Sequence, residues 1–289
     1  MSLLVRINLV LGAALAIFGV VLGYCCWEIL EANAKREVTR EAALMMDSAL
    51  ATRTYTSMEI LPLLAERMKT EFLPQTVPFY AATQNFLKLR EQHPAYLYKE
   101  ATLNPTNPRD RAADWEGDLI QQFRSDPATH EITGERDTPR GRALYLARPI
   151  RAESECLGCH SAASSAPATL IARYGSDNGF GWELNEIVGA HVVSVPLAGA
   201  MASAEATFHA IVTAIAAVLI TLLAIVNGVV YFLVVRPIRR MAGVAEEISS
   251  GNRTAAEISA SGSSELAMLA QSFNRLRTSL EKAMKLLEP

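Results

Sequence analysis

Two uncharged apolar runs limit what this chain can fold into. The first extends from Ile7 to Trp27 and the second from Ala210 to Val235. Each has at least the roughly 20 residues that a helix needs to cross a hydrocarbon core of about 30 Å. We therefore expect transmembrane helices at residues 7–27 and 209–235, with a folded segment, residues 28–208, between them.

The first run also fits the start of a secretory signal peptide, because Arg6 precedes an apolar core. Three features favour an uncleaved anchor instead. The apolar run is long, no small-x-small cleavage site precedes the polar sequence, and Trp27 lies where an interfacial aromatic anchor is expected. We expect this helix to stay in the mature protein.

Positive charges beside the two runs predict the orientation of the chain. The flanking basic residues are Arg6, Arg236, Arg239 and Arg240. Because Lys and Arg accumulate in short cytoplasmic flanks, residues 1–6 and 236–289 are predicted to be cytoplasmic and residues 28–208 periplasmic. The chain is then a two-pass protein of the bacterial inner membrane.

Cys156-Leu157-Gly158-Cys159-His160 is the motif with the clearest chemistry. Two thiols three positions apart, followed at once by an imidazole, are typical of c-type haem attachment. Each thiol forms a thioether with the porphyrin, and the histidine becomes an axial iron ligand. The alternatives are a chance Cys-x-x-Cys, a disulfide, or half of a zinc site, which would need a second Cys/His pair. We predict one covalent haem c on Cys156 and Cys159, with His160 as the proximal ligand.

The segment between the two runs has the pattern of helices followed by antiparallel strands. We expect helices over residues 28–72, 79–92 and 109–124, and strands over residues 96–103, 132–136, 142–150 and 188–195. Asn107 is expected to cap the third helix, with Pro108 in its first turn. This order predicts a small α+β domain with its helices on one face of the sheet.

Two short helices with heptad-like spacing are expected after the second run. Their apolar stripes are Ile238, Met241, Ala245 and Ile248, then Leu266, Leu269, Phe273, Leu276 and Leu280. Gly251-Asn252 and residues 259–263 form a polar connector between them. Neither helix can bury its stripe alone, so we expect a homodimer through these helices.

This last region resembles a HAMP domain, the parallel four-helix dimer module of histidine kinases and chemoreceptors. The resemblance covers residues 236 to about 287 and rests on Arg236-Pro237-Ile238, Gly251-Asn252, Glu265 and Ser272-Phe273-Asn274. Ser264 stands where the family commonly has an acidic residue.

Residues from about 40 to 198 resemble the single-haem, PAS-like periplasmic sensor domain. The matching motifs are Asn104-Pro105-Thr106-Asn107-Pro108, Asp114-Trp115-Glu116, Arg148-Pro149-Ile150, Cys156 to His160, Tyr174-Gly175, Gly179-Phe180-Gly181-Trp182 and Val193-Ser194-Val195-Pro196. The resemblance implies a PAS-like fold and haem c with a proximal histidine. Some members use a cysteine on the first helix, shortly before a proline, as the sixth ligand. Here the corresponding stretch, Tyr55-Thr56-Ser57-Met58 before Pro62, contains no cysteine.

The sixth iron ligand therefore stays open between several candidates. Met58 has the favourable position and is weighed equally with an open or water-occupied iron; methionines on apolar helix faces are more often core residues. The further candidates are Met45, Met46 and His93. The other histidines are expected in a loop, in a strand and at the membrane boundary: His130, His191 and His209. Arg148 fits a haem propionate or an exposed salt bridge equally well, and Trp115 and Trp182 fit the core or a haem wall.

Together these features predict a transmembrane sensor and not an enzyme. A diatomic gas or a redox change at the haem would bias two packings of the helices and so signal through the second span to the HAMP domain. No output domain precedes residue 289, so we expect a separate cytoplasmic partner. A net charge of −3 leaves no footprint for nucleic acid. The first alternative is a membrane-anchored monohaem electron-transfer cytochrome. A third hypothesis is a haem enzyme such as a peroxidase, for which no distal His/Arg pair can be identified from the sequence.

Overall fold

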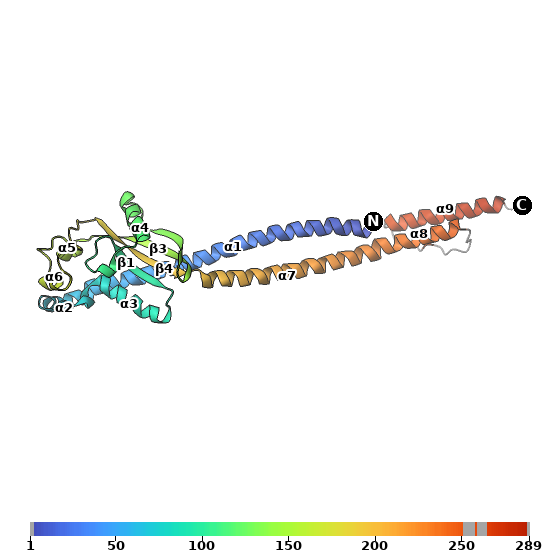
Figure 1. The fold of residues 1–289 in the computed structure, drawn as a ribbon. Helices are drawn as coiled ribbons and strands as arrows, with labels where there is room; N and C mark the ends of the chain where they lie inside the picture. The colour runs from blue at the N-terminus through green and yellow to red at the C-terminus, as the bar shows by residue number, and fades with distance from the viewer. Residues whose placement is uncertain (1–2, 251–257, 259–264, 288–289) are drawn as a thin grey trace. The chain divides into compact units, whose positions relative to one another are not determined.

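The computed structural model describes residues 3–250, 258 and 265–287. The chain divides into two compact units, one made of Met1–Cys26 with Phe208–Pro289 and the other of Trp27–Thr207 (Figure 1). The predicted polar connector, with Gly251-Asn252, residues 259–263 and Ser264, lies outside the described residues.

A nearly continuous helical segment leads into the Trp27–Thr207 unit. It consists of α1 (Leu3–Tyr55), the π-helical turn η1 (Thr56–Ile60) and α2 (Leu61–Met68). The predicted long first helix is confirmed, although it ends at Met68 and not at residue 72. Pro62 lies in the first turn of α2, directly after the π-helical turn, and its ring nitrogen has no hydrogen to donate to the preceding turn.

Four antiparallel strands form one sheet in the order β1-β4-β3-β2. They are β1 (Leu97–Thr102), β2 (Ile132–Thr138), β3 (Gly141–Arg151) and β4 (Ile187–Pro196). All four coincide with the strands predicted from alternation, to within a few residues. β3 and β4 are neighbours, and the connection between them carries the Cys-x-x-Cys-His motif.

Helices cover both faces of this sheet. Val193 and Val195 of β4 pack in one cluster with residues of α1 and α3 (Pro78–Gln92). Val192 packs in another cluster with residues of α4 (Asp114–Ser125), and Figure 1 shows α3 and α4 on opposite sides of the strands. Successive strand residues point to opposite faces, so the prediction of helices on one face is wrong. β4 is buried along nearly its whole length and is mostly apolar on both faces, with His191 and Ser194 as buried polar exceptions, as expected of a strand covered on both sides.

The helix predicted to begin at Arg109 begins at Asp114. Asn107 does cap a helical turn, since its side chain accepts from the Arg109 N–H at 3.3 Å, but this turn is a separate 3₁₀-helix, η3 (Pro108–Asp110). Arg111 is extended and forms a parallel bridge with Thr102 of β1. This pairing with the sheet edge interrupts the helix for three residues.

The other unit contains the second apolar helix from Phe208 onward and the two C-terminal helices. Their elements are α7 (Ala198–Val230), the π-turn η4 (Tyr231–Val235), α8 (Arg236–Ser249) and α9 (Glu265–Leu287). Within the described part of the chain, two helical segments could cross a membrane by length and composition, Val5–Met68 and Ala198–Ser249. The Asn274 side chain of α9 donates to the Ile258 carbonyl at 2.8 Å and accepts from its N–H at 3.2 Å.

Candidate functional site

The Cys-x-x-Cys-His motif folds as a short helix, α5 (Ser154–His160). Helix positions i, i+3 and i+4 share one face, so the spacing brings the thiols of Cys156 and Cys159 and the imidazole of His160 to the same side. Leu157 packs instead against the small apolar cluster where β3 ends and β4 begins. This contact fixes α5 on the end of the sheet.

A backbone carbonyl holds the imidazole of His160. Its Nδ1 lies 2.7 Å from the Gly179 carbonyl oxygen and 3.5 Å from the Thr106 hydroxyl, and its ring stacks on Trp182 with centroids 4.2 Å apart. A carbonyl can only accept, so we assign the hydrogen to Nδ1, which leaves the Nε2 lone pair available. Burial lowers the pKa of His160, although the bond to Gly179 opposes this shift. The side chain is therefore a neutral imidazole, the form that binds metals.

The carbonyl can reach His160 because residue 179 is a glycine. Gly179 has a φ of +85°, a conformation that residues with a Cβ rarely adopt. A Cβ built at this position would also overlap the hydroxyl of Thr106. The loops at residues 104–108 and 179–182 therefore meet at His160 through a contact that excludes a larger side chain. Sequence reasoning noted both motifs but assigned neither of them this role.

An apolar cavity of about 110 Å³ borders His160. Its walls are mostly aromatic and aliphatic: Phe72, Val77, Phe79, Tyr80, Leu170, Tyr174 and Trp182. Two of these residues belong to α6 (Ala168–Tyr174), a helix that sequence reasoning missed. Its signal was the spacing of Leu170 and Tyr174, four residues apart. Thr169 ties α6 to α2 by donating to the Met68 carbonyl at 3.1 Å.

Arg109 and Asp110 form a charged edge of the cavity. The Arg109 Nε lies 3.4 Å from Asp110 Oδ1, and its guanidinium carbon lies 6.0 Å from the centroid of the Tyr80 ring. Burial raises the pKa of Asp110, while the charge of Arg109 opposes this shift. A guanidinium beside an apolar cavity is suited to a ligand that combines an apolar body with carboxylates.

Arg148, the cation that we had considered for this role, is engaged elsewhere. Its guanidinium pairs with Asp47 of α1 at 2.6 Å and with Glu131 at 2.9 Å. The sequence allowed either a haem propionate or a salt bridge as the partner of Arg148, and the structure favours the salt bridge. Trp115 packs beside Tyr145 at 5.5 Å under the Arg136 guanidinium, whereas Trp182 lines the cavity.

The candidates for a sixth ligand lie in different environments. Met58 is on η1, has 69% of its surface exposed, and is not among the described residues that line the cavity. Met46 is buried in the core between α1 and the sheet. His93 caps the end of α3 beside Tyr96. His191 lies in β4, as expected of a strand residue.

Comparison with known proteins identifies both parts of the chain. The model of the Tll0287-like family matches residues 31–196, more than half of the chain. The chain belongs to the Tll0287-like family. In this Tll0287-like protein a HAMP domain matches residues 230–282. A solved structure, that of the cyanobacterial heme-protein Tll0287, is similar with a TM-score of 0.44 and 15% identity, over 55% of this chain and 95% of that one. No curated protein matches.

Both resemblances drawn from the sequence are thereby confirmed. A mixed helix and sheet domain of the Tll0287-like family is flanked by two helices apolar enough to cross a membrane, and a HAMP domain follows. This order of elements is that of a membrane protein that transmits a signal.

Proposed function

We propose that residues 28–208 form a periplasmic sensor domain that carries one covalent haem c. Residues 7–27 and 209–235 cross the bacterial inner membrane in this proposal, and residues 1–6 and 236–289 are cytoplasmic. The two apolar helices and the basic residues beside them support this topology. The HAMP domain then passes the state of the sensor to a separate cytoplasmic partner.

Three side chains on one face of α5 would hold the haem. Cys156 and Cys159 would form the thioethers, and His160 would bind the iron through Nε2. The observation that carries the proposal is the bond from His160 Nδ1 to the Gly179 carbonyl, because such a bond orients a ligating histidine and sets its tautomer. When bound, the haem supplies an iron whose coordination changes with a diatomic gas or an electron.

The surroundings of His160 fit this role. Aromatic and aliphatic side chains line the cavity beside the imidazole, and stacking on Trp182 limits its rotation. Arg109 at the edge of the cavity would pair with a propionate carboxylate. Met58 stays a prediction for the sixth ligand, with an open or water-occupied iron as the alternative.

The proposed homodimer rests on apolar surface that one chain leaves uncovered. Leu269, Leu276 and Leu280 of α9 follow heptad spacing and are all exposed in the single chain. A second copy of the HAMP helices would cover them. β4 leads through Leu197 directly into α7, so a displacement of the sheet would reach the HAMP helices along one unbroken segment. We propose signalling through this segment, without enzymatic activity in the chain itself.

Optical spectroscopy of the purified full-length protein, produced with the c-type haem attachment machinery, tests the haem assignment. We expect a c-type pyridine haemochrome spectrum, and haem that stays on the polypeptide in denaturing electrophoresis. Both should be lost in the variant Cys156→Ser/Cys159→Ser. The matched control is Cys25→Ser/Cys26→Ser in the first apolar run, which we expect to keep a full complement of haem. A double variant at the motif that is as red as the wild type would contradict covalent attachment.

Carbon monoxide then separates the sensor from the electron-transfer cytochrome. We expect the Soret band of the reduced protein to shift on addition of carbon monoxide, because a gas sensor needs an iron position that a ligand can occupy. A spectrum that carbon monoxide leaves unchanged, combined with rapid electron exchange with a donor protein, would favour the cytochrome.

A further inference from the structure

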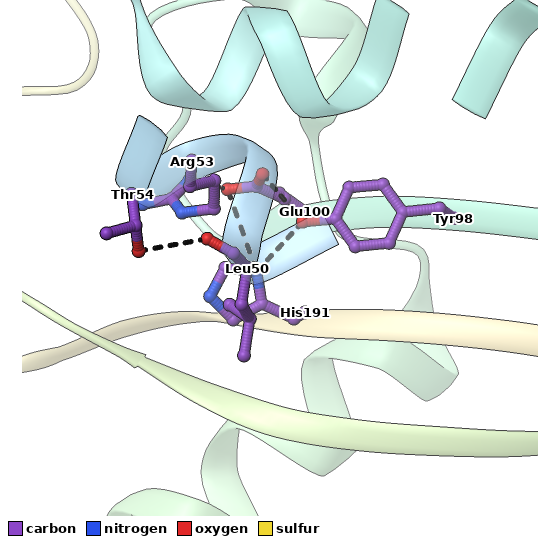
Figure 2. A network of polar contacts seen from close by, with 6 residues as sticks. All are labelled: Leu50, Arg53, Thr54, Tyr98, Glu100 and His191. Carbon is purple, nitrogen blue, oxygen red and sulfur yellow. Dashed lines mark hydrogen bonds and ion pairs between the residues drawn. The ribbon is translucent and has the colours of Figure 1, made fainter. Parts of the chain in front are cut away.

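A buried polar network joins α1 to β1 and β4 (Figure 2). Arg53 of α1 forms an ion pair with Glu100 of β1. The Tyr98 hydroxyl donates to the other oxygen of this carboxylate at 2.7 Å. His191 of β4 places its Nδ1 3.2 Å from the Tyr98 oxygen and 3.7 Å from Glu100 Oε2. The four side chains thus form one connected group between the helix and the two strands.

Glu100 is the centre of this network. Its side chain has no exposed surface, while that of Arg53 keeps 23%. A buried carboxylate is costly unless it is both paired and hydrogen-bonded. Here one oxygen faces Arg53 and the other accepts from Tyr98. Since Tyr98 has a single hydroxyl hydrogen, His191 must donate its Nδ1–H to Tyr98, so every donor in the chain points toward the carboxylate.

The rest of the buried face of α1 differs from Arg53 in kind. Its residues are mostly small and all apolar: Ala34, Val38, Ala42, Met46 and Ala49. Apolar contacts are not directional, and small side chains form shallow ridges, so this stripe has little preference for one axial position. Arg53 follows Ala49 by four residues on the same face. A shift of one residue, about 1.5 Å along the axis, would draw its guanidinium away from Glu100.

Lys35 and Asp47 also link α1 to the sheet through ion pairs, and both pairs are more exposed. Lys35 pairs with Glu135 of β2 at 2.9 Å with 35% of the lysine side chain exposed, and Asp47, which is 62% exposed, pairs with Arg148 at 2.6 Å. Exposed pairs contribute little because water replaces either partner and long side chains adjust. If the helix is displaced, water can replace the lost partner in the two exposed pairs, but it cannot reach the buried carboxylate of Glu100 to replace Arg53.

The network also lies where three parts of the domain meet. α1 continues from the first apolar run, and β4 continues through Leu197 into α7. One turn beyond Arg53, Ser57 of η1 donates to Glu155 of α5 at 3.3 Å. A displacement of the helix that bears the Cys-x-x-Cys-His motif therefore acts on α1 within one turn of the ion pair.

We propose that the Arg53–Glu100 pair is a register lock, which fixes the axial position of α1 on the sheet and connects it, through Tyr98 and His191, to the strand that leads into α7. The lock depends on contacts of the protein alone, so it goes beyond the proposed haem function and does not require it. If the domain signals, the lock defines which of two helix positions is the resting one.

Pulsed electron paramagnetic resonance of the full-length protein in nanodiscs tests this lock. Spin labels on a keto amino acid placed at the exposed positions Ser48 and Asp137 report the position of α1 against β2. The test variant is Arg53→Gln/Glu100→Gln, which removes the pair without leaving a lone buried charge and therefore keeps the domain able to fold. The matched control, Asp47→Asn/Arg148→Gln, removes an exposed pair between the same helix and the sheet.

We expect one narrow distance distribution in the wild type and in the control. In the test variant we expect a distribution at least about twofold broader, or a second population displaced by about 1.5 Å per residue of slip. A test variant whose distribution superimposes on that of the wild type would overturn the proposal. The labels react with the keto group and not with cysteine, so the same measurement can be made in Cys156→Ser/Cys159→Ser. The lock predicts the wild-type distance distribution in this variant, whether or not the haem assignment holds.

Discussion

Two histidines of this chain are withdrawn from water by different surroundings. Burial lowers the pKa of both His160 and His191. His160 rests on the carbonyl of Gly179 and borders a cavity. His191 is enclosed in the middle of β4, with Tyr98 and Glu100 beside its Nδ1. Burial alone therefore does not make a histidine a candidate metal ligand. His160 is a candidate because its Nδ1 is hydrogen-bonded to a carbonyl while its ring borders a cavity.

The largest expected effect comes from breaking the group around His191. Arg53→Gln leaves the Glu100 carboxylate buried without its cation, so we expect the free energy of unfolding to fall by about 3 kcal/mol. Asp47→Asn removes an exposed ion pair and is expected to cost less than about 1 kcal/mol. Urea unfolding of the full-length protein, followed by fluorescence, measures both. Equal losses in the two variants would show that Glu100 does not depend on Arg53.

The next effect sharpens the His160 side of the comparison. Gly179→Ala combines a left-handed φ, which costs about 1–2 kcal/mol in a residue with a Cβ, with an overlap against Thr106. Gly181→Ala is the control, because Gly181 has a φ of +83° but open space around its Cβ position. We expect Gly181→Ala to lose about 1 kcal/mol of stability and to keep the optical spectrum of the haem protein. We expect Gly179→Ala to lose more stability and to change that spectrum. A spectrum unaffected by Gly179→Ala would remove the carbonyl from the site.

The pH dependence of stability tests the state of the network. The pKa of His191 is well below the ordinary 6.5 because of burial first, and then because of the charges of Arg53 and Arg148. The folded protein therefore binds fewer protons at this site than the unfolded chain, and stability must fall as the pH drops below about 6.5. We expect His191→Gln to make this fall shallower in urea unfolding between pH 5 and 8.

Glu100 supplies the internal control for that experiment, because its shift has the opposite sign. Burial raises the pKa of Glu100, and Arg53 and Tyr98 partly oppose this. At a pH between the ordinary 4.5 and this raised value, the folded protein binds more protons than the unfolded chain, so stability rises as the pH falls. Glu100→Gln should remove this gain and make the acid loss steeper. The same change of slope in both variants would contradict the assignment.

The smallest effect on stability concerns two arginines, one at the edge of the cavity and one in β3. Arg109 and Arg148 form partly exposed ion pairs, so replacing either by Gln should cost less than about 1 kcal/mol. Under the proposed function, Arg109→Gln should shift the midpoint potential of the haem in a redox titration, because Arg109 edges the cavity. Arg148→Gln should leave the potential unchanged. If the midpoint potential shifted in Arg148→Gln and not in Arg109→Gln, Arg148 would be the partner of the propionate.

Local spacing along the chain predicts several parts of this protein. Two uncharged runs predict two long helices, alternation predicts four strands, and the i, i+3, i+4 spacing from Cys156 to His160 brings three reactive groups to one helix face. Asn107 and Pro108 predict the start of a helix at residue 109, but the structure forms only a separate 3₁₀ turn there and the helix begins at Asp114. Each of these depends on residues close together in the chain, where the period of a helix or strand suffices.

The contacts between groups far apart in the chain become visible only once the helices and strands are packed together. The partner of His160 is a backbone carbonyl 19 residues away, and a carbonyl carries no side-chain signature in the sequence. Arg53 and Glu100 are 47 residues apart and each resembles an ordinary surface charge until a helix is laid on a sheet. Burial then makes the two charges depend on each other, because a charge that water solvates needs a specific partner once the solvent is removed.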